Sequence, residues 1–385
     1  ALGRPPEMRV IHVITGLAPD GAQTMLLTLL QATDPGRIES HVISLTDRGV
    51  IGPRIARLGI PVEALNIRPG ASAAFAVPQL ARHIRKVTPD LVQTWMYHAD
   101  LLGRFACRSA RRPALVWNIR HSELDPTGTK HTTRLVARAC ARLSHRGVDA
   151  IACVSERTRE IHAALGYRRD IMQVIPNGFN VERFRPDPRA RTAIRNELGI
   201  ADSTPLLGVL ARFHPQKDHL GFLQAAARLH QAHPSWHFLL AGRGADWSNP
   251  ALTGPIREHS LAAHVHLLGQ RNDTARLFAA LDVLISASAY GEGFPNVIGE
   301  AMACAVPCVV TDVGDSAEIV ADTGRVVPAR NPMALTAAVE KLFDLPREDL
   351  ESLGAAARER VERAYGISAI ANRYAAMYET IIGDR

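Results

Sequence analysis

The stretch MRVIHVITGLAPDGAQTMLLTLLQ, residues 8–31, decides the fold class of this chain. Its first eight residues form a short apolar, β-branched run that is typical of a buried strand, and residues 23–31 place apolar side chains at helical spacing. The loop between these two segments begins with Gly16 and includes Gly21. A buried strand that passes through a glycine-containing loop into a helix predicts an α/β unit with a parallel sheet.

The alternation of strand and helix continues along the chain. Further strands are predicted at residues 41–45, 91–95, 115–119 and 150–154. Residues 175–188 then interrupt both periodicities with proline, asparagine and glycine. Beyond this stretch, strands are predicted at residues 206–210, 238–241, 265–268, 283–286, 308–311 and 326–327. The sequence therefore predicts two Rossmann-like, doubly wound domains, which a length of 385 residues also favours.

The interrupting stretch sets the predicted domain boundaries. We assign residues 1–180 to an N-terminal domain, residues 181–366 to a C-terminal domain, and residues 367–385 to a closing helical segment. Doubly wound domains bind ligands at the carboxyl ends of their strands. We therefore expect ligands in the crevice between the two domains.

Composition narrows the function classes. Hydrophobic residues at 46% and charged residues at 22% are typical of a globular protein, and no apolar run has the length of a bilayer span. The first residues lack the apolar core of a signal peptide, so we expect a cytoplasmic protein. The five cysteines show no metal-type spacing. A net charge of +7 indicates anionic partners, but the basic residues are spread along the chain without a nucleic-acid motif, which argues against nucleic acid.

Strand ends in the N-terminal domain carry candidate ligand-binding residues. Gly21 lies in the loop after the first strand, where the backbone can approach a phosphate closely. His98 and His121 each follow a later strand, and Arg120 adds a cation suited to a phosphate or carboxylate. Histidines are also common structural donors, but two at the same sheet edge favour ligand contact.

Two loops in the C-terminal domain are suited to an anion. Arg212 and Lys217 follow the strand at residues 206–210, where a bidentate guanidinium and a compact ammonium can neutralise a diphosphate. Gly242 and Arg243 begin a glycine loop after the next strand. The alternative for the two cations is a pair of ordinary surface side chains.

The stretch GEGFPNVIGEA, residues 291–301, holds two carboxylates, Glu292 and Glu300. Its glycines and Pro295 predict a loop, and Asn296 begins a predicted helix. Glu300 is expected in or near the first turn, where free N–H groups favour an anion such as phosphate. The alternative is a capped helix with two solvated carboxylates.

Basic residues recur every fourth position in one predicted helix, at Arg134, Arg138, Arg142 and Arg146. The helix is amphipathic, which is consistent with a surface helix packed on the core or with contact to an anionic membrane surface. His230, His233 and His237 are expected to be solvated loop residues rather than metal ligands, because Pro234 interrupts their spacing.

Together these motifs resemble the family 4 glycosyltransferases of the GT-B fold over nearly the whole chain. Glu292 and Glu300 match the family's paired-glutamate motif, and Arg212 and Lys217 match its R-x-x-x-x-K pair. The run PNGFN, residues 176–180, resembles the interdomain signature of the family. The loop Gly-Ala-Gln, residues 21–23, resembles the family's G-G-A-E loop but departs from it at Ala22 and Gln23.

The resemblance implies a retaining, metal-independent hexosyltransferase without a cofactor. Its donor would be a nucleotide diphosphate sugar, with UDP favoured over GDP, and its acceptor a hydroxyl of a lipid-linked glycan or a lipopolysaccharide or exopolysaccharide precursor. The enzyme would lie in the cytoplasm or at the inner face of the plasma membrane. The final helix would cross back to the N-terminal domain.

The resemblance also implies residue roles. Arg212 and Lys217 would stabilise the departing diphosphate, and Glu300 would hold the ribose. The catalytic set is expected to be Arg212, Lys217, His121 and Glu292, and the acceptor side is expected to include His98 and Arg120. The donor-binding residues are expected to be Gly21, Gly242, Arg243, Gly293, Phe294, Pro295, Asn296, Val297 and Glu300.

Two alternatives stay open at the level of the sequence. One is a non-hydrolysing nucleotide-sugar epimerase of similar architecture, which would need acid and base residues of its own. The other is a non-enzymatic sugar-binding or nucleotide-binding protein.

Overall fold

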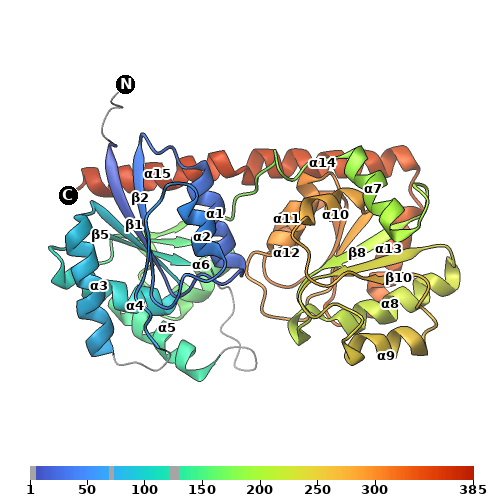
Figure 1. Cartoon of the computed structure of the whole chain (residues 1–385), viewed down its shortest axis with the longest axis horizontal. Coiled ribbons are helices and arrows are strands. Elements are labelled where there is room, and N and C mark those ends of the chain that lie inside the picture. Colours follow the sequence, from blue (N-terminus) through green and yellow to red (C-terminus); the bar gives the residue numbers. More distant parts are fainter. Residues whose placement is uncertain (1–5, 69–72, 121–129) are drawn as a thin grey trace. The chain divides into compact units, whose positions relative to one another are not determined.

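A computed structural model describes residues 6–68, 73–120 and 130–385 of the chain (Figure 1). The chain forms two compact units. Unit 1 contains Ala1–Gly178 together with Ile367–Arg385, and unit 2 contains Phe179–Gly366. Each unit is built on one parallel sheet covered by helices, so the predicted pair of Rossmann-like domains is confirmed.

Unit 1 has a seven-stranded sheet in the order β3-β2-β1-β4-β5-β6-β7. Its strands are β1 Met8–Ile14, β2 Ile38–Ser44, β3 Val62–Ala64, β4 Leu91–Trp95, β5 Ala114–Ile119, β6 Ala150–Cys153 and β7 Met172–Val174. Its helices are α1 Gly21–Ala32, α2 Ile51–Ala56, α3 Ala73–Val87, α4 Tyr97–Ser109, α5 His131–Leu143, α6 Glu156–Ala164 and α15 Ile367–Gly383.

The central strand β1 is buried on both faces, which explains its unbroken apolar run. Val10 and Ile14 pack with α1 and α15 on one face, whereas Ile11 and Val13 pack with α3, α4 and α5 on the other. Helix α15, from the end of the chain, therefore completes the core of unit 1. The sequence analysis missed β3 and β7, because strands of three residues are too short to show a periodic pattern.

Unit 2 has a six-stranded parallel sheet in the order β10-β9-β8-β11-β12-β13. Its strands are β8 Leu206–Leu210, β9 His237–Ala241, β10 Val265–Leu267, β11 Val283–Ser286, β12 Cys308–Thr311 and β13 Gly324–Val327. Its α-helices are α7 Pro188–Leu198, α8 His219–Ala232, α9 Pro250–Glu258, α10 Thr274–Ala280, α11 Asn296–Ala303, α12 Ser316–Val320, α13 Pro332–Phe343 and α14 Arg347–Tyr365. One face of this sheet packs against α8, α9 and α13.

The positions of His230 and His237 differ from the expectation that these histidines are solvated loop residues. His230 lies in α8 and His237 in β9, so neither is a solvated loop residue. His237 Nδ1 lies 2.9 Å from His266 Nε2, and the rings of His230 and His264 are 4.2 Å apart. Burial, followed by the neighbouring histidines, lowers the pKa of His237 to about 4. Sequence spacing missed this cluster because two of its members come from β10 and the turn before it.

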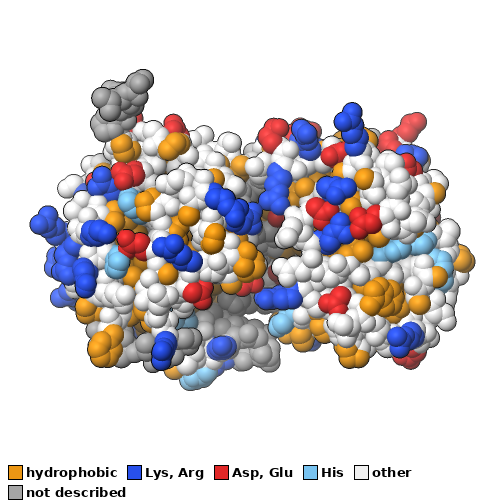
Figure 2. All heavy atoms as spheres, viewed as in Figure 1, with side chains coloured by type: hydrophobic (Ala, Val, Ile, Leu, Met, Phe, Trp, Pro, Cys, Tyr) orange, Lys and Arg blue, Asp and Glu red, His pale blue; other side chains and the backbone are white. Residues whose placement is uncertain are grey.

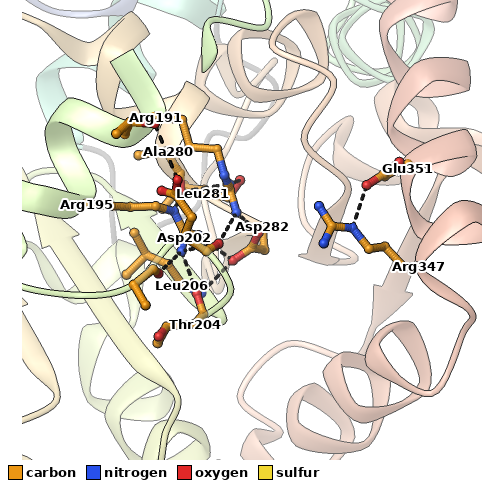
Figure 3. Close-up of polar contacts among 12 residues, drawn as sticks. Arg191, Arg195, Asp202, Thr204, Leu206, Ala280, Leu281, Asp282, Arg347 and Glu351 are labelled. Carbon is orange, nitrogen blue, oxygen red and sulfur yellow. Dashed lines mark hydrogen bonds and ion pairs between the residues drawn. The ribbon is translucent and has the colours of Figure 1, made fainter. Parts of the chain in front are cut away.

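A buried guanidinium fixes the amino ends of two neighbouring strands in unit 2 (Figure 3). Arg195 of α7 is fully buried, and its Nη2 donates to Asp282 Oδ2 at 2.7 Å. The same carboxylate oxygen accepts from the backbone N–H of Leu206 at 2.7 Å. Asp282 precedes β11 and Leu206 begins β8, so one carboxylate links the starts of both strands. The other bonds of Arg195 go to the carbonyl oxygens of Ala201, Asp202, Thr204 and Ala280.

We predict that Arg195→Met lowers the free energy of unfolding by about 3 kcal/mol, because it leaves buried carbonyls without donors and weakens the pairing of Asp282. The measurement is urea unfolding followed by circular dichroism. Arg347→Met is the matched control: Arg347 pairs with Glu351, but its side chain is 85% exposed, so we expect a loss below about 1 kcal/mol. Equal losses in the two variants would contradict the role given to Arg195.

Candidate functional site

The candidate site lies at the carboxyl edge of the unit 2 sheet, where the loops after β8, β9 and β11 come together. Strand β8 pairs in parallel with β9 on one side and with β11 on the other. Because parallel strands end at the same edge, loops far apart in the sequence become neighbours there. The three loops are residues 211–218, 242–249 and 287–295.

The loops after β8 and β11 meet in an ion pair. Lys217 Nζ donates to Glu292 Oε1, and the two residues are 75 positions apart in the sequence. The same carboxylate oxygen accepts from Ser288 Oγ at 2.5 Å. The side chain of Glu292 is only 8% exposed, so Lys217 neutralises a nearly buried charge. The structure thus brings together two residues that the sequence assigned to separate motifs.

Two further hydrogen bonds, one from a side chain and one between backbone groups, join the same two loops. Gln216 donates through its side-chain amide to the Gly291 carbonyl at 2.8 Å, and the backbone N–H of Ala289 donates to the Gln216 carbonyl at 2.8 Å. The ammonium of Lys217 is therefore placed by the fold of both loops. Sequence reasoning gave no signal for Gln216 or Ser288, because their contacts exist only after the loops meet.

The loop after β9 depends on a glycine. Gly242 has φ +150, and a Cβ there would lie 2.1 Å from the Ala211 carbonyl oxygen. This close approach lets the Phe213 N–H donate to the Arg243 carbonyl at 2.8 Å. Gly242 thus joins the loop after β8 to the loop after β9, and Arg243 takes part through its backbone.

A pocket of about 170 Å³ opens beside these loops, within unit 2. It contains four of the predicted site residues, Arg212, Gly242, Val297 and Glu300. The other lining residues were not predicted: Leu210, Ala211, Ala241, Gln270, Arg271, Thr274 and Phe278. Gln270 and Arg271 follow the end of β10, so the rule that ligands bind at strand ends could have found them.

Arg271 forms a rigid part of the pocket wall. Its guanidinium donates to Asp273 Oδ2 at 2.8 Å and to Glu197 Oε1 at 2.6 Å. These carboxylates raise the pKa of Arg271 above its ordinary value. A fixed, permanently charged plane suits a planar or anionic group of a ligand.

Glu300 projects into the pocket from α11, just past the first turn of that helix. Burial raises the pKa of its carboxyl to about 7, and the positive charge of Arg183 opposes this shift. The carboxyl therefore changes its protonation state near neutral pH, and hydrogen bonds from a ligand's hydroxyls would favour the ionised form.

Residues 293–297 form the remaining predicted part of the site. Pro295 is the N-cap residue of α11, and Asn296 and Val297 are its first two residues. The Gly293 carbonyl accepts from the backbone N–H of Asp315 at 3.0 Å. The ring of Phe294 is only 7% exposed, so this residue can offer its backbone to a ligand but little of its side chain.

The predicted residues of unit 1 lie at the carboxyl ends of its strands. Gly21 is the first residue of α1, and His98 is the second residue of α4; both are exposed. Arg120 follows β5, donates to the Ile175 carbonyl at 3.0 Å, and lies over the Trp95 ring at 5.4 Å. Burial lowers the pKa of this guanidinium.

His121, which the sequence placed in the catalytic set, lies outside the described residues. Its predicted role at the strand end after Arg120 stays a prediction.

The predicted basic helix corresponds to α5, which contains Arg134, Arg138 and Arg142. Arg146 lies beyond the end of α5, and its carbonyl accepts from Arg104 Nε at 2.7 Å. The helix is therefore shorter than the four-residue repeat suggested, although Arg138 and Arg142 are exposed on it.

In the part of the chain that the structure describes, no helix combines the length and the apolar character that a membrane span requires. Within the same residues, no group of three or more His, Cys, Asp or Glu side chains is arranged to hold a metal ion.

Two family models match the chain in succession. Residues 19–183 match the model described as Glycosyltransferase Family 4, and residues 204–344 match the model described as Glycosyl transferases group 1. The first matched range lies in unit 1, except for residues 179–183, which belong to unit 2. The second matched range lies in unit 2 and contains all six strands of the unit 2 sheet.

Individual proteins show the same similarity. The lipopolysaccharide core biosynthesis mannosyltransferase LpsB of Rhizobium meliloti is 25% identical over 371 residues, which covers 89% of this chain and 100% of that protein. The N,N'-diacetylbacillosaminyl-diphospho-undecaprenol alpha-1,3-N-acetylgalactosaminyltransferase of Campylobacter jejuni is 26% identical over 312 residues, which covers 79% of this chain and 80% of that protein.

Among solved structures, HepE of Anabaena in complex with UDP superposes with a TM-score of 0.86 at 22% identity, and the match covers 97% of this chain and 100% of that one. At this level of identity the likeness establishes the fold alone.

We predict that Lys217→Met destabilises the protein by about 2 kcal/mol, because it leaves the carboxylate of Glu292 nearly buried without its cation. The double variant Lys217→Met with Glu292→Gln should recover most of this loss, since neither charge remains and the amide still accepts from Ser288. The measurement is the free energy of unfolding in urea for both single variants and the double variant. Additive losses would show that the two side chains do not stabilise each other.

Proposed function

The chain belongs to the glycosyltransferases of family 4, and we propose that it is a retaining, metal-independent enzyme that transfers a hexosyl group from a UDP-sugar to a lipid-linked glycan or lipopolysaccharide precursor. The observation that carries this proposal is the meeting of Lys217 and Glu292 at the edge where Arg212, Gly242 and Glu300 line a pocket. A cationic loop beside a carboxyl-lined pocket suits a nucleotide diphosphate, whose phosphates need positive charge and whose ribose offers hydroxyl groups.

In the proposed reaction the bond between the sugar's anomeric carbon and the diphosphate breaks, and its electron pair goes to the phosphate oxygen. Arg212 and Lys217 stabilise the negative charge that develops there. Lys217 has three N–H donors, so it can keep its bond to Glu292 while it donates to phosphate. The acceptor oxygen forms the new bond to the anomeric carbon on the face from which the diphosphate leaves, and the departing phosphate takes the proton of that hydroxyl. Attack on the same face retains the anomeric configuration. Proton NMR of the product's anomeric configuration tests this step, and inversion would rule it out.

The donor and acceptor classes are supported by the similar proteins. HepE of Anabaena was solved with UDP and also with UDP-glucose. The Campylobacter protein is named for an acceptor on diphospho-undecaprenol, and the Rhizobium protein for the lipopolysaccharide core. We therefore favour a UDP-sugar, with a GDP-sugar as the alternative donor, and an acceptor that carries a lipid.

Donor binding is tested by thermal unfolding with UDP, UDP-glucose and GDP in the presence of EDTA. We expect UDP and UDP-glucose to raise the melting temperature, because a ligand that binds only the folded state stabilises it. Lys217→Ala should abolish the shift, whereas Lys341→Ala, which removes an exposed lysine of α13 in the same unit, should keep it. A shift that survives in Lys217→Ala, or the lack of any shift in the wild type, would overturn the donor assignment.

The pKa of Glu300 predicts how donor affinity depends on pH. With a pKa of about 7 in the free protein, the carboxyl is largely protonated below pH 7 and must lose its proton to accept two ribose hydrogen bonds. Affinity for UDP-glucose should therefore rise with pH through 7 and level off above it, with a loss of up to about tenfold per pH unit below 7. Isothermal titration calorimetry measures this profile. The profile of Glu300→Gln should be flat, and a matching slope in that variant would assign the titration to another group.

We also propose that unit 1 associates peripherally with the anionic inner face of the plasma membrane. The exposed residues Arg138 and Arg142 lie on α5, and α5 also exposes Leu135 at 50%. Helix α4, which packs against α5, exposes Phe105 at 42%. Helix α3, which packs against α4, carries further cations, and Lys and Arg side chains gather on this side of unit 1 in Figure 2. The exposed cations of α3 are Arg82, Arg85 and Lys86. Cations interspersed with apolar side chains are typical of a surface that binds anionic lipid.

Co-sedimentation with phosphatidylglycerol vesicles tests the membrane proposal. Arg138→Glu with Arg142→Glu should release most of the protein from the vesicles, because each cation near an anionic surface is worth about 1 kcal/mol. The control is Arg228→Glu with Arg257→Glu, which makes the same charge change on α8 and α9 of unit 2 and should leave binding intact. An equal loss of vesicle binding in both double variants would show that binding depends on the net charge of the protein and not on α5.

A further inference from the structure

Three aromatic rings from distant parts of unit 2 pack beneath the loop at residues 291–295. Phe179 comes from the start of the unit, Phe294 from the loop itself, and Tyr365 from the end of α14. The ring centroids of Phe179 and Phe294 are 6.1 Å apart in a stacked arrangement, and those of Phe294 and Tyr365 are 5.4 Å apart edge to face. All three side chains are at most 7% exposed. The loop therefore has an aromatic floor.

Phe179 also lies against α11 at the residue before Glu300. A Cβ on Gly299 would lie 2.2 Å from Cε2 and Cζ of the Phe179 ring, so the ring occupies the space that any side chain at this position would need. The absence of a side chain at Gly299 lets the ring touch the helix directly. Phe179 thus contacts both the loop that leads into α11 and the helix that carries Glu300.

The backbone of Phe179 is fixed where the chain passes between the two units. Its N–H donates to the Tyr365 carbonyl at 2.8 Å, and it forms a parallel bridge with Gly366. Phe179 is the first residue of unit 2, and Gly366 is the last. The incoming and outgoing segments are therefore bonded to each other at the residue whose ring supports the loop.

On its other side the loop is held by a tight turn. A Cβ on Gly314 would lie 2.5 Å from the Glu292 carbonyl oxygen, and the next residue, Asp315, donates its N–H to the Gly293 carbonyl. The loop is thus held in place by contacts with this turn and with the aromatic floor, because its own glycines do little to restrict its backbone conformation. Loss of either set of contacts would leave the backbone of residues 293–297 free to shift.

We infer that Phe179 is a positioning residue for donor binding: its ring sets the conformation of residues 293–297 and the position of Glu300. This inference rests on the proposed function, since it treats that loop and helix as the donor site. A pre-organised loop binds its ligand without first losing conformational freedom, and a misplacement of about 1 Å can weaken function by about 100-fold. The alternative is that Phe179 is only a core residue whose loss lowers stability.

Two matched variants separate these readings. Phe179→Leu keeps an apolar side chain but removes the far edge of the ring, and we expect it to weaken UDP binding, measured by isothermal titration calorimetry, by about tenfold or more. Phe222→Leu makes the same change at a fully buried ring of unit 2, which packs edge to face on Phe238 at 6.2 Å. We expect Phe222→Leu to lower the melting temperature at least as much as Phe179→Leu and to leave UDP affinity unchanged. Equal UDP affinity in wild type and Phe179→Leu would overturn the inference.

A compensating pair provides the second test. Gly299→Ala should weaken UDP binding because its methyl group pushes the Phe179 ring away, and Phe179→Leu removes Cε2 and Cζ, the two ring atoms that the methyl group would approach most closely. The double variant should therefore bind UDP more tightly than either single variant, a rescue that a purely structural role would not produce. Losses that simply add in the double variant would contradict the inference. If the wild type itself fails to bind UDP or UDP-glucose, the proposed function is what has failed.

Discussion

Parallel pairing of β8 with β9 and β11 is the constraint on which the candidate site depends. It places the carboxyl ends of three strands at one edge, so that Lys217 meets Glu292 and the loop after β9 approaches Ala211 at Gly242. The same pairing must be fixed at the opposite edge, where the buried guanidinium of Arg195 and the carboxylate of Asp282 link the starts of β8 and β11. The charge network at one edge thus supports the geometry of the site at the other.

The site combines fixed charge with close backbone packing. Lys217 and Arg271 are each paired with carboxylates, so their positions are set before a ligand arrives. Gly242 and Gly314 permit backbone approaches that no side chain would allow. Such an arrangement binds an anion with side chains that are already placed, and this pre-organisation is how electrostatic stabilisation becomes effective in a transition state.

The sequence predicts features that depend on local pattern and misses those that depend on folding. Buried strands such as β1 and β8, and a helix beginning at Asn296, follow from periodicity and loop residues. Strands β3 and β7 are too short to show a period, and His237 was misassigned because its neighbour His266 comes from another strand. The contact of Lys217 with Glu292 and the floor under Phe294 are tertiary contacts, which no spacing in the sequence encodes.

The assignment of a nucleotide diphosphate to the loops after β8, β9 and β11 is tested most directly by a crystal structure of the protein with UDP. We expect the diphosphate to lie within hydrogen-bonding distance of Arg212 and Lys217, and the ribose hydroxyls to donate to Glu300. We also expect Lys217 to keep its contact with Glu292 in the complex. A structure in which UDP binds elsewhere and these side chains contact no part of it would contradict this assignment.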